Sequence, residues 1–206
     1  MPTSDIETIH EFDIKGGWAI QEGKRVDPFD IVDALQGTGA KIYVHDLDGR
    51  ARNRPQLDLV QDLSLEVVLW YDGGIRQSEG VIDPLVAGAE MVALDPAYLK
   101  GEVEFERVLK LTSNVFLDLL SEHEDRIPDF NKSITSGSGM TRLLSMGFQN
   151  FVIRPGEELA FENTGFEGQV NLYLRQGSPG EKSFPASGKI KGIVKDLSEL
   201  VIEDES

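Results

Sequence analysis

The sequence predicts an α/β fold, a (β/α)8 TIM barrel that is shortened or imperfect in its second half, and two observations predict it. First, short apolar runs alternate with helical segments along most of the chain, which is typical of a parallel sheet or barrel. Second, similar residues recur at one spacing in the two halves, as a duplicated half-barrel would show. The 206 residues suit a single domain over 1–206, with an acidic tail at about 199–206.

The clearest alternating unit covers residues 65–101. Leu65–Tyr71 is apolar and rich in valine, as expected of a strand buried on both faces. The turn Asp72-Gly73-Gly74-Ile75-Arg76 follows, and a helical pattern then leads to a second apolar run, Met91–Leu94. Parallel strands joined by helices keep their ligand chemistry in the loops after the strands, so this turn is a candidate site.

The other elements follow from the same two patterns. Gly37 and Gly147 are placed to end helices, and Pro55 to begin one. Strands are expected at Thr8–Ile14 with a further run to Ile20, Lys41–Leu47, Glu66–Tyr71, Met91–Leu94, Asn114–Leu120, Asn150–Arg154, Gln169–Leu174 and, more weakly, Gly192–Lys195. Helices are expected at Asp30–Leu35, Arg54–Leu63, Val81–Val86, Glu102–Lys110 and Thr141–Met146.

Two pairs of residues carry the internal repeat. Asp118 follows Asp13 by 105 residues, and Gly177 follows Gly73 by 104. The alternative is chance spacing of common residue types. In a barrel of eight strands the first and fifth lie opposite each other, so Asp13 and Asp118 are expected to face one another at the C-terminal mouth.

Composition and charge narrow the classes of function. The formal net charge of −16 argues against general nucleic-acid binding, which needs a basic face. The sequence contains no run of about 18 apolar residues, so no membrane span is expected. The absence of cysteine excludes disulfides and thiolate chemistry. The acidic N-terminus does not have the pattern of a secretory signal, so a cytoplasmic protein is expected.

Five segments in order resemble the histidine-biosynthesis barrel family, the HisA/HisF proteins. They are FDIKGG at 12–17, IYVHDLDG at 42–49, YDGGIR at 71–76, AGAEMVAL at 87–94 and VFLDLL at 115–120. The resemblance covers about the first 120 residues and is weaker beyond them. It implies a TIM barrel without a metal or organic cofactor, whose substrate is a phosphorylated small molecule. Members either isomerise a phosphoribosyl aminoimidazole carboxamide in an Amadori rearrangement or close the imidazole ring.

The resemblance also implies roles for particular residues. Asp13 and Asp118 match the family's acid–base pair, although each could instead cap a turn after its strand. Gly73, Gly74 and Arg76 match a phosphate loop, and the alternative is a tight turn with an exposed arginine. A second anion site is expected at Arg175, Gly177 and Ser178, where the arginine could bind phosphate with two hydrogen bonds; a surface loop is the alternative.

Asp46, at the end of the second strand, could bind a substrate hydroxyl or orient a neighbour. A metal site with His45 and Asp48 is disfavoured, because His45 points away from Asp46 in a strand.

The sequence departs from the family pattern where phosphate would bind. Asp72 stands where the family has the first of three glycines, and a carboxylate there repels phosphate unless a cation neutralises it. Asp95-Pro96 replaces a Gly-Thr pair, and proline has no N–H to donate. The leading hypothesis is therefore a divergent aldose–ketose isomerase of a phosphoribosyl compound. The alternatives are a paralogue that has lost this reaction and acts as a binding or assembly protein, an oligomer included, and an enzyme for another, less anionic molecule.

Overall fold

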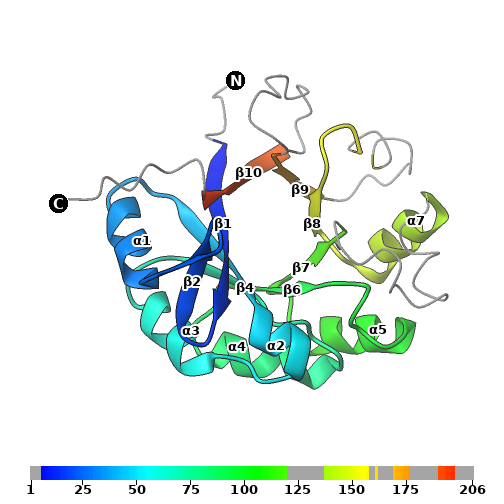
Figure 1. Cartoon of the computed structure of the whole chain (residues 1–206). Helices are drawn as coiled ribbons and strands as arrows, with labels where there is room; N and C mark the ends of the chain where they lie inside the picture. The colour runs from blue at the N-terminus through cyan, green and yellow to red at the C-terminus, as the bar shows by residue number, and fades with distance from the viewer. Residues whose placement is uncertain (1–5, 120–136, 158–160, 162–168, 177–189, 198–206) are drawn as a thin grey trace.

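The computed structural model describes residues 6–119, 137–157, 161, 169–176 and 190–197. Eight parallel strands form one sheet that closes on itself, because the last strand pairs with the first (Figure 1). The barrel strands are β1 (Glu7–Lys15), β4 (Lys41–Asp46), β5 (Leu69–Asp72), β6 (Met91–Leu94), β7 (Val115–Asp118), β8 (Asn150–Ile153), β9 (Asn171–Arg175) and β10 (Ile190–Asp196). The predicted α/β barrel is thus confirmed, and each of its strands overlaps an expected one.

Helices lie outside the ring of strands and pack their apolar faces against it (Figure 1). In α5, for example, Phe105 and Val108 are buried while the first turn is acidic and exposed in part. Asp27 caps α1 by accepting the N–H of Phe29. The helices are α1 (Pro28–Leu35), α2 (Leu47–Arg52), α3 (Leu57–Ser64), α4 (Ile82–Val86), which follows the 3-10 turn η1 (Ser78–Val81), α5 (Glu102–Leu111) and α7 (Gly137–Met146).

Two local features differ from the expected elements. The run to Ile20 is not a barrel strand: β2 (Trp18–Gln21) and β3 (Lys24–Val26) form an antiparallel hairpin that extends β1 at the barrel mouth. The helix expected at 54–63 begins at Leu57, and a short separate helix, α2, precedes it. Pro55 therefore lies between two helices rather than in a first turn.

Side chains that point into the barrel form an apolar layer with one residue from each strand. All eight are buried, and the aromatic ones pack on one another, such as Trp70 against Phe116 and Tyr173, with ring centroids 4.8 and 4.7 Å apart. The layer consists of Ile9, Tyr43, Trp70, Ala93, Phe116, Val152, Tyr173 and Val194. Its position fixes which residues of every strand face the interior, because side chains alternate along a strand.

The helices of the described ranges include none that combines the length and the apolar character needed to cross a membrane.

Candidate functional site at the barrel mouth

Two residues beyond the apolar layer, toward the C-terminal end, every strand carries an ionisable residue. We call this set the ionic layer: Glu11, His45, Asp72, Asp95, Asp118, Arg154, Arg175 and Asp196. Arg154 and Asp196 are exposed, whereas Asp72 and Asp95 are at most 1% exposed. A charged layer directly above an aromatic one places polar chemistry at the end of the barrel where enzymes of this architecture bind substrates.

Arg175 ties two carboxylates of the ionic layer together. Its Nη2 lies 2.8 Å from Oδ2 of Asp118, and its Nε lies 2.9 Å from Oε2 of Glu11. Tyr43 donates its hydroxyl to the same Asp118 oxygen at 2.8 Å. Burial would raise the pKa of Asp118, but the charges of Arg175 and His45 outweigh burial and hold that pKa below its usual value. Asp118 is therefore ionised at neutral pH.

His45 lies between two acidic side chains. Its Nε2 is 3.1 Å from Oε2 of Glu11, and its Nδ1 is 3.6 Å from Oδ2 of Asp72. The second distance is long for a hydrogen bond, so charge alone holds that pair. Burial would lower the pKa of His45, but the two carboxylates raise it to about 9. The imidazole is therefore protonated at neutral pH.

Asp72 and Asp95 share one guanidinium from α2. Nη2 of Arg50 lies 3.5 Å from Oδ2 of Asp72 and 3.2 Å from Oδ2 of Asp95. Although burial would raise the pKa of Asp72, Arg50 and His45 lower it to about 2. Burial, together with the negative charge of Asp72, raises the pKa of Asp95 to about 7, against the effects of the Ala97 N–H and Arg50. Arg50 and His45 together thus compensate Asp72, whereas Arg50 compensates Asp95 only in part.

We expect Asp95→Asn to stabilise the protein at pH 8. The folded pKa of Asp95 lies above its unfolded value of 3.8, so stability falls as pH rises from about 4 to 7, and the cost is complete above 7. An amide keeps the acceptor for Ala97 and loses the Arg50 contact, but it removes the buried charge. The net effect should be a rise in the free energy of unfolding of about 1–3 kcal/mol at pH 8. Urea unfolding at pH 5 and pH 8 measures it. The gain should shrink at pH 5, and Asp62→Asn, an exposed change on α3, should show no such pH dependence. An equal gain in the free energy of unfolding at both pH values would contradict the raised pKa of Asp95.

Asp46 points out of the barrel, opposite to His45, and is completely buried. Its carboxylate accepts hydrogen bonds from the N–H groups of Asp48, Gly49 and Gln56, from the Gln56 amide and from the Tyr71 hydroxyl, at 2.7–3.0 Å. It therefore fastens α2 and the start of α3 to β4 and β5. Of the two roles expected for Asp46, this geometry matches the orientation of neighbours and leaves no access for a substrate hydroxyl.

The glycine turn after β5 is packed by the protein itself. A Cβ on Gly73 would lie 2.4 Å from the Tyr71 hydroxyl, and one on Gly74 would lie 2.9 Å from Cα of Arg50. The Gly74 N–H donates to Asp72. These positions need glycine because α2 and Tyr71 approach closely. A role of these glycines in holding a phosphate stays a prediction.

Arg76 and Arg175, which the sequence predicted to bind phosphate, both contact other groups of the protein. Arg76 donates to the carbonyl oxygens of Gly49, Arg50 and Gly74 and to the Asn53 side chain. It is therefore a brace between the β5 loop and α2 as well as a side chain of the pocket. Arg175, expected to bind phosphate with two hydrogen bonds, is occupied by Asp118 and Glu11. Gly177 and Ser178 lie outside the described residues.

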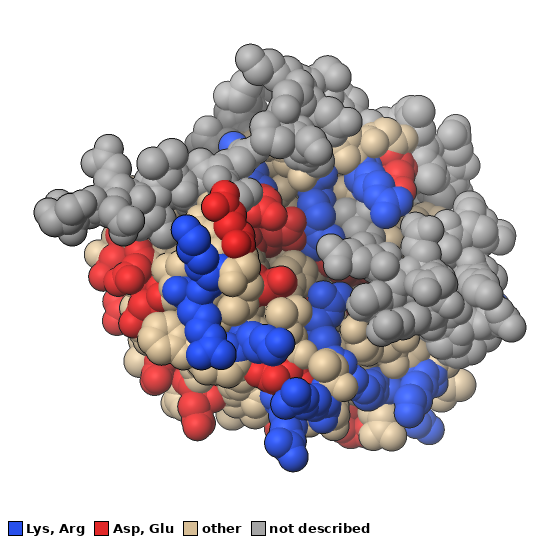
Figure 2. All heavy atoms as spheres, viewed as in Figure 1, with Lys and Arg blue, Asp and Glu red and all other residues tan. Residues whose placement is uncertain are grey.

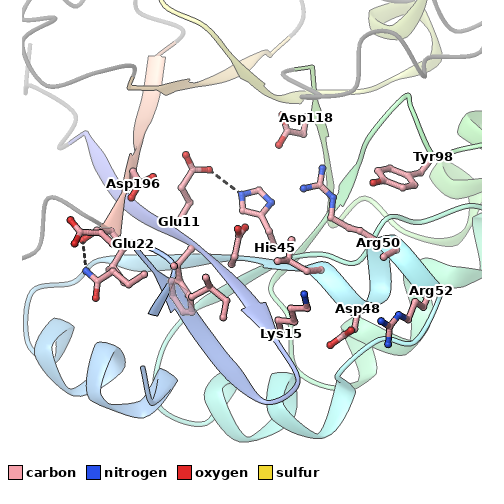
Figure 3. A pocket seen from close by; sticks show the side chains of 18 of the residues that line it. Glu11, Lys15, Glu22, His45, Asp48, Arg50, Arg52, Tyr98, Asp118 and Asp196 are labelled. Carbon is pink, nitrogen blue, oxygen red and sulfur yellow. Dashed lines mark hydrogen bonds and ion pairs between the residues drawn. The ribbon is translucent and has the colours of Figure 1, made fainter. Parts of the chain in front are cut away.

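A pocket of about 1040 Å³ opens at the mouth of the barrel, above the ionic layer (Figure 3). Both residues of the predicted acid–base pair, Asp13 and Asp118, line it. Asp13 comes from the part of β1 that pairs with the β2 hairpin, one position further out than Glu11 on the same face. The described residues contain no group of three or more acidic or histidine side chains arranged to hold a metal ion.

Residues of the site that the sequence did not predict as its members include Glu11, His45 and Arg50; His45 was considered only as a disfavoured metal ligand. A signal was available for the first two, because each lies two residues after an apolar residue of the barrel interior. This signal can be used only when it is known which face of a uniformly apolar strand points into the barrel. Arg50 gave no such signal, since it reaches the ionic layer from a helix outside the strands.

No protein-family model matches this chain, and no curated protein sequence matches it.

Proposed function

We propose that the chain is an acid–base enzyme that acts at the mouth of its barrel on a small phosphorylated compound. The reaction that the site supports best is the aldose–ketose isomerisation of a phosphoribosyl aminoimidazole compound, as in the HisA/HisF family that its first 120 residues resemble. The observation that carries the proposal is that Asp13 and Asp118, 105 residues apart in the chain, line one pocket.

The chemistry of such an isomerisation needs two proton carriers. An acid protonates the ring oxygen so that the sugar opens to an imine, and a base removes the proton from C2; returning a proton to C1 then gives the ketone. We assign the base to Asp118, because its lowered pKa keeps it ionised at neutral pH. The acid role then falls to Asp13.

The test is turnover of a phosphoribosyl aminoimidazole carboxamide substrate. Asp13→Asn and Asp118→Asn should each lower kcat/KM by at least about 100-fold, since an amide neither gives nor takes the proton. Asp62→Asn should leave kcat/KM within about twofold, because this carboxylate is exposed on α3, away from the pocket. Full activity in Asp13→Asn would overturn the assignment.

A second candidate is favoured by one observation. The glycine turn that would cradle a substrate phosphate in the family is filled by α2, and Asp72 takes up its Gly74 N–H. This supports a paralogue that has lost the histidine-pathway reaction and uses the same pocket for another small molecule, or serves as a binding protein. In that case the wild-type protein leaves the ribotide unchanged.

A further inference from the structure

Most acidic side chains of the pocket lie on one side and most basic ones on the other, although Asp48 and Asp118 lie on the side of Arg50 (Figure 3). On one side, which we call the acidic wall, stand Glu11, Glu22 and Asp196 from β1, the hairpin and β10. On the other side, the basic wall, stand Lys15, Arg50, Arg52 and Arg76, from the end of β1, α2 and the β5 loop. A ligand that fits such a pocket has an anionic end and an end that donates hydrogen bonds.

Three cations of the basic wall differ from Arg50, which lies between Asp72 and Asp95. Among the described residues, no carboxylate forms an ion pair with Lys15, Arg52 or Arg76, although Asp48 lies on the same side and accepts the N–H of Gly16. The acceptors of Arg76 are carbonyl and amide oxygens, which fix its guanidinium without cancelling its charge. A fixed guanidinium needs less ordering when it binds an anion.

The charge of the pocket contrasts with that of the chain. The sequence contains 36 acidic and 20 basic residues, whereas the described residues that line the pocket include as many cationic as acidic side chains when His45 is protonated. Figure 2 shows the basic side chains gathered over the middle of this face. The acidic surface of the protein repels a dissolved anion, and this repulsion is therefore weakest at the mouth of the barrel.

We propose that the pocket binds a phosphate monoester of a hydroxylated compound, with its phosphate on the basic wall and its hydroxyls directed to the acidic wall. The site differs from the glycine turn after β5, which the chain itself fills. This inference rests on the proposed function in one respect, namely that the ligand carries a phosphate group. The phosphate would receive charge-assisted hydrogen bonds from Arg52, Arg76 and Lys15, and the carboxylates opposite would accept from hydroxyls.

The experiment is isothermal titration calorimetry with ribose 5-phosphate, inorganic phosphate and ribose as probes. Ribose 5-phosphate should bind more tightly than inorganic phosphate, and uncharged ribose should give no measurable heat. Arg52→Glu and Lys15→Glu should each weaken ribose 5-phosphate binding by about tenfold or more. Arg54→Glu is the matched control: it changes charge equally two residues from Arg52, at an exposed position outside the pocket, and should alter binding by less than about threefold.

The outcomes separate this inference from the proposed function. Ribose 5-phosphate binding that depends on Arg52 but not on Arg54 supports the basic wall, even if the protein turns over no ribotide. Equal weakening by Arg52→Glu and Arg54→Glu would reduce the effect to overall charge and overturn the inference. The inference is also overturned if ribose 5-phosphate does not bind. If turnover is measured, a wild-type KM in both Arg52→Glu and Lys15→Glu would overturn it as well. All variants replace exposed side chains, and their thermal unfolding shows whether each is folded.

Discussion

Arg175→Met is expected to lower the free energy of unfolding at pH 7 by about 3 kcal/mol or more. Arg175 contacts both Glu11 and Asp118, and its own side chain is 19% exposed. Without the guanidinium, Asp118 keeps the Tyr43 hydroxyl and Glu11 keeps His45, but two carboxylates remain close together in a largely water-excluded layer. Removing one partner of a buried ion pair is costly because the remaining charge is left uncompensated.

Urea unfolding of matched variants measures this effect. Arg142→Met removes an ion pair with Glu102 on the surface, where the arginine side chain is 61% exposed, and should cost less than about 1 kcal/mol. Adding Asp118→Asn to Arg175→Met should recover part of the lost stability, because it removes one of the stranded charges. A loss for Arg175→Met no larger than that for Arg142→Met would show that the ionic layer does not depend on this arginine.

Asp46→Asn is expected to have a comparable effect, a loss of about 2–4 kcal/mol. All five groups that contact the Asp46 carboxylate are donors in the structure. An amide presents one acceptor oxygen, so its NH2 group would face donors in either orientation. These donors are the Gln56 N–H and the Tyr71 hydroxyl in one orientation, and the N–H groups of Asp48 and Gly49 with the Gln56 amide in the other. Gln56 cannot freely turn its side chain to compensate, because its Oε1 accepts the N–H of Gly17.

Denaturant unfolding again provides the measurement. Asp33→Asn is the control, since Asp33 is an exposed carboxylate on α1 whose side chain accepts a hydrogen bond from Gln36 at 3.1 Å, and its replacement should cost less than about 0.5 kcal/mol. If Asp46→Asn unfolds like the wild type, the carboxylate does not fasten α2 to the barrel. A large loss would support a fixed α2, on which the placement of Arg50 and Arg52 in the pocket depends.

The sequence alone predicted the barrel well, and the reason is local. The barrel strands are short apolar runs separated by helices, and burial on both faces produces that pattern wherever a parallel sheet forms. The expected strand at Met91–Leu94 agrees with β6 at both ends, and the helix expected at Glu102–Lys110 agrees with α5 within one residue. The same reading could not detect α2, because Leu47–Arg52 is short and without apolar periodicity, and hydrogen bonds from distant residues hold it.

The sequence by itself determined the fold class. It also placed Asp13 and Asp118 toward the C-terminal ends of their strands, and this is the end of the barrel at which the pocket opens. Only the tertiary structure decided what those residues face. In a strand such as Lys41–Asp46, which is apolar on both sides until its last residues, the sequence does not say whether His45 or Asp46 points inward, and barrel closure settles it. The partners of Arg175 lie 57 and more residues away in the chain, so only packing shows that this arginine pairs with Asp118 and Glu11.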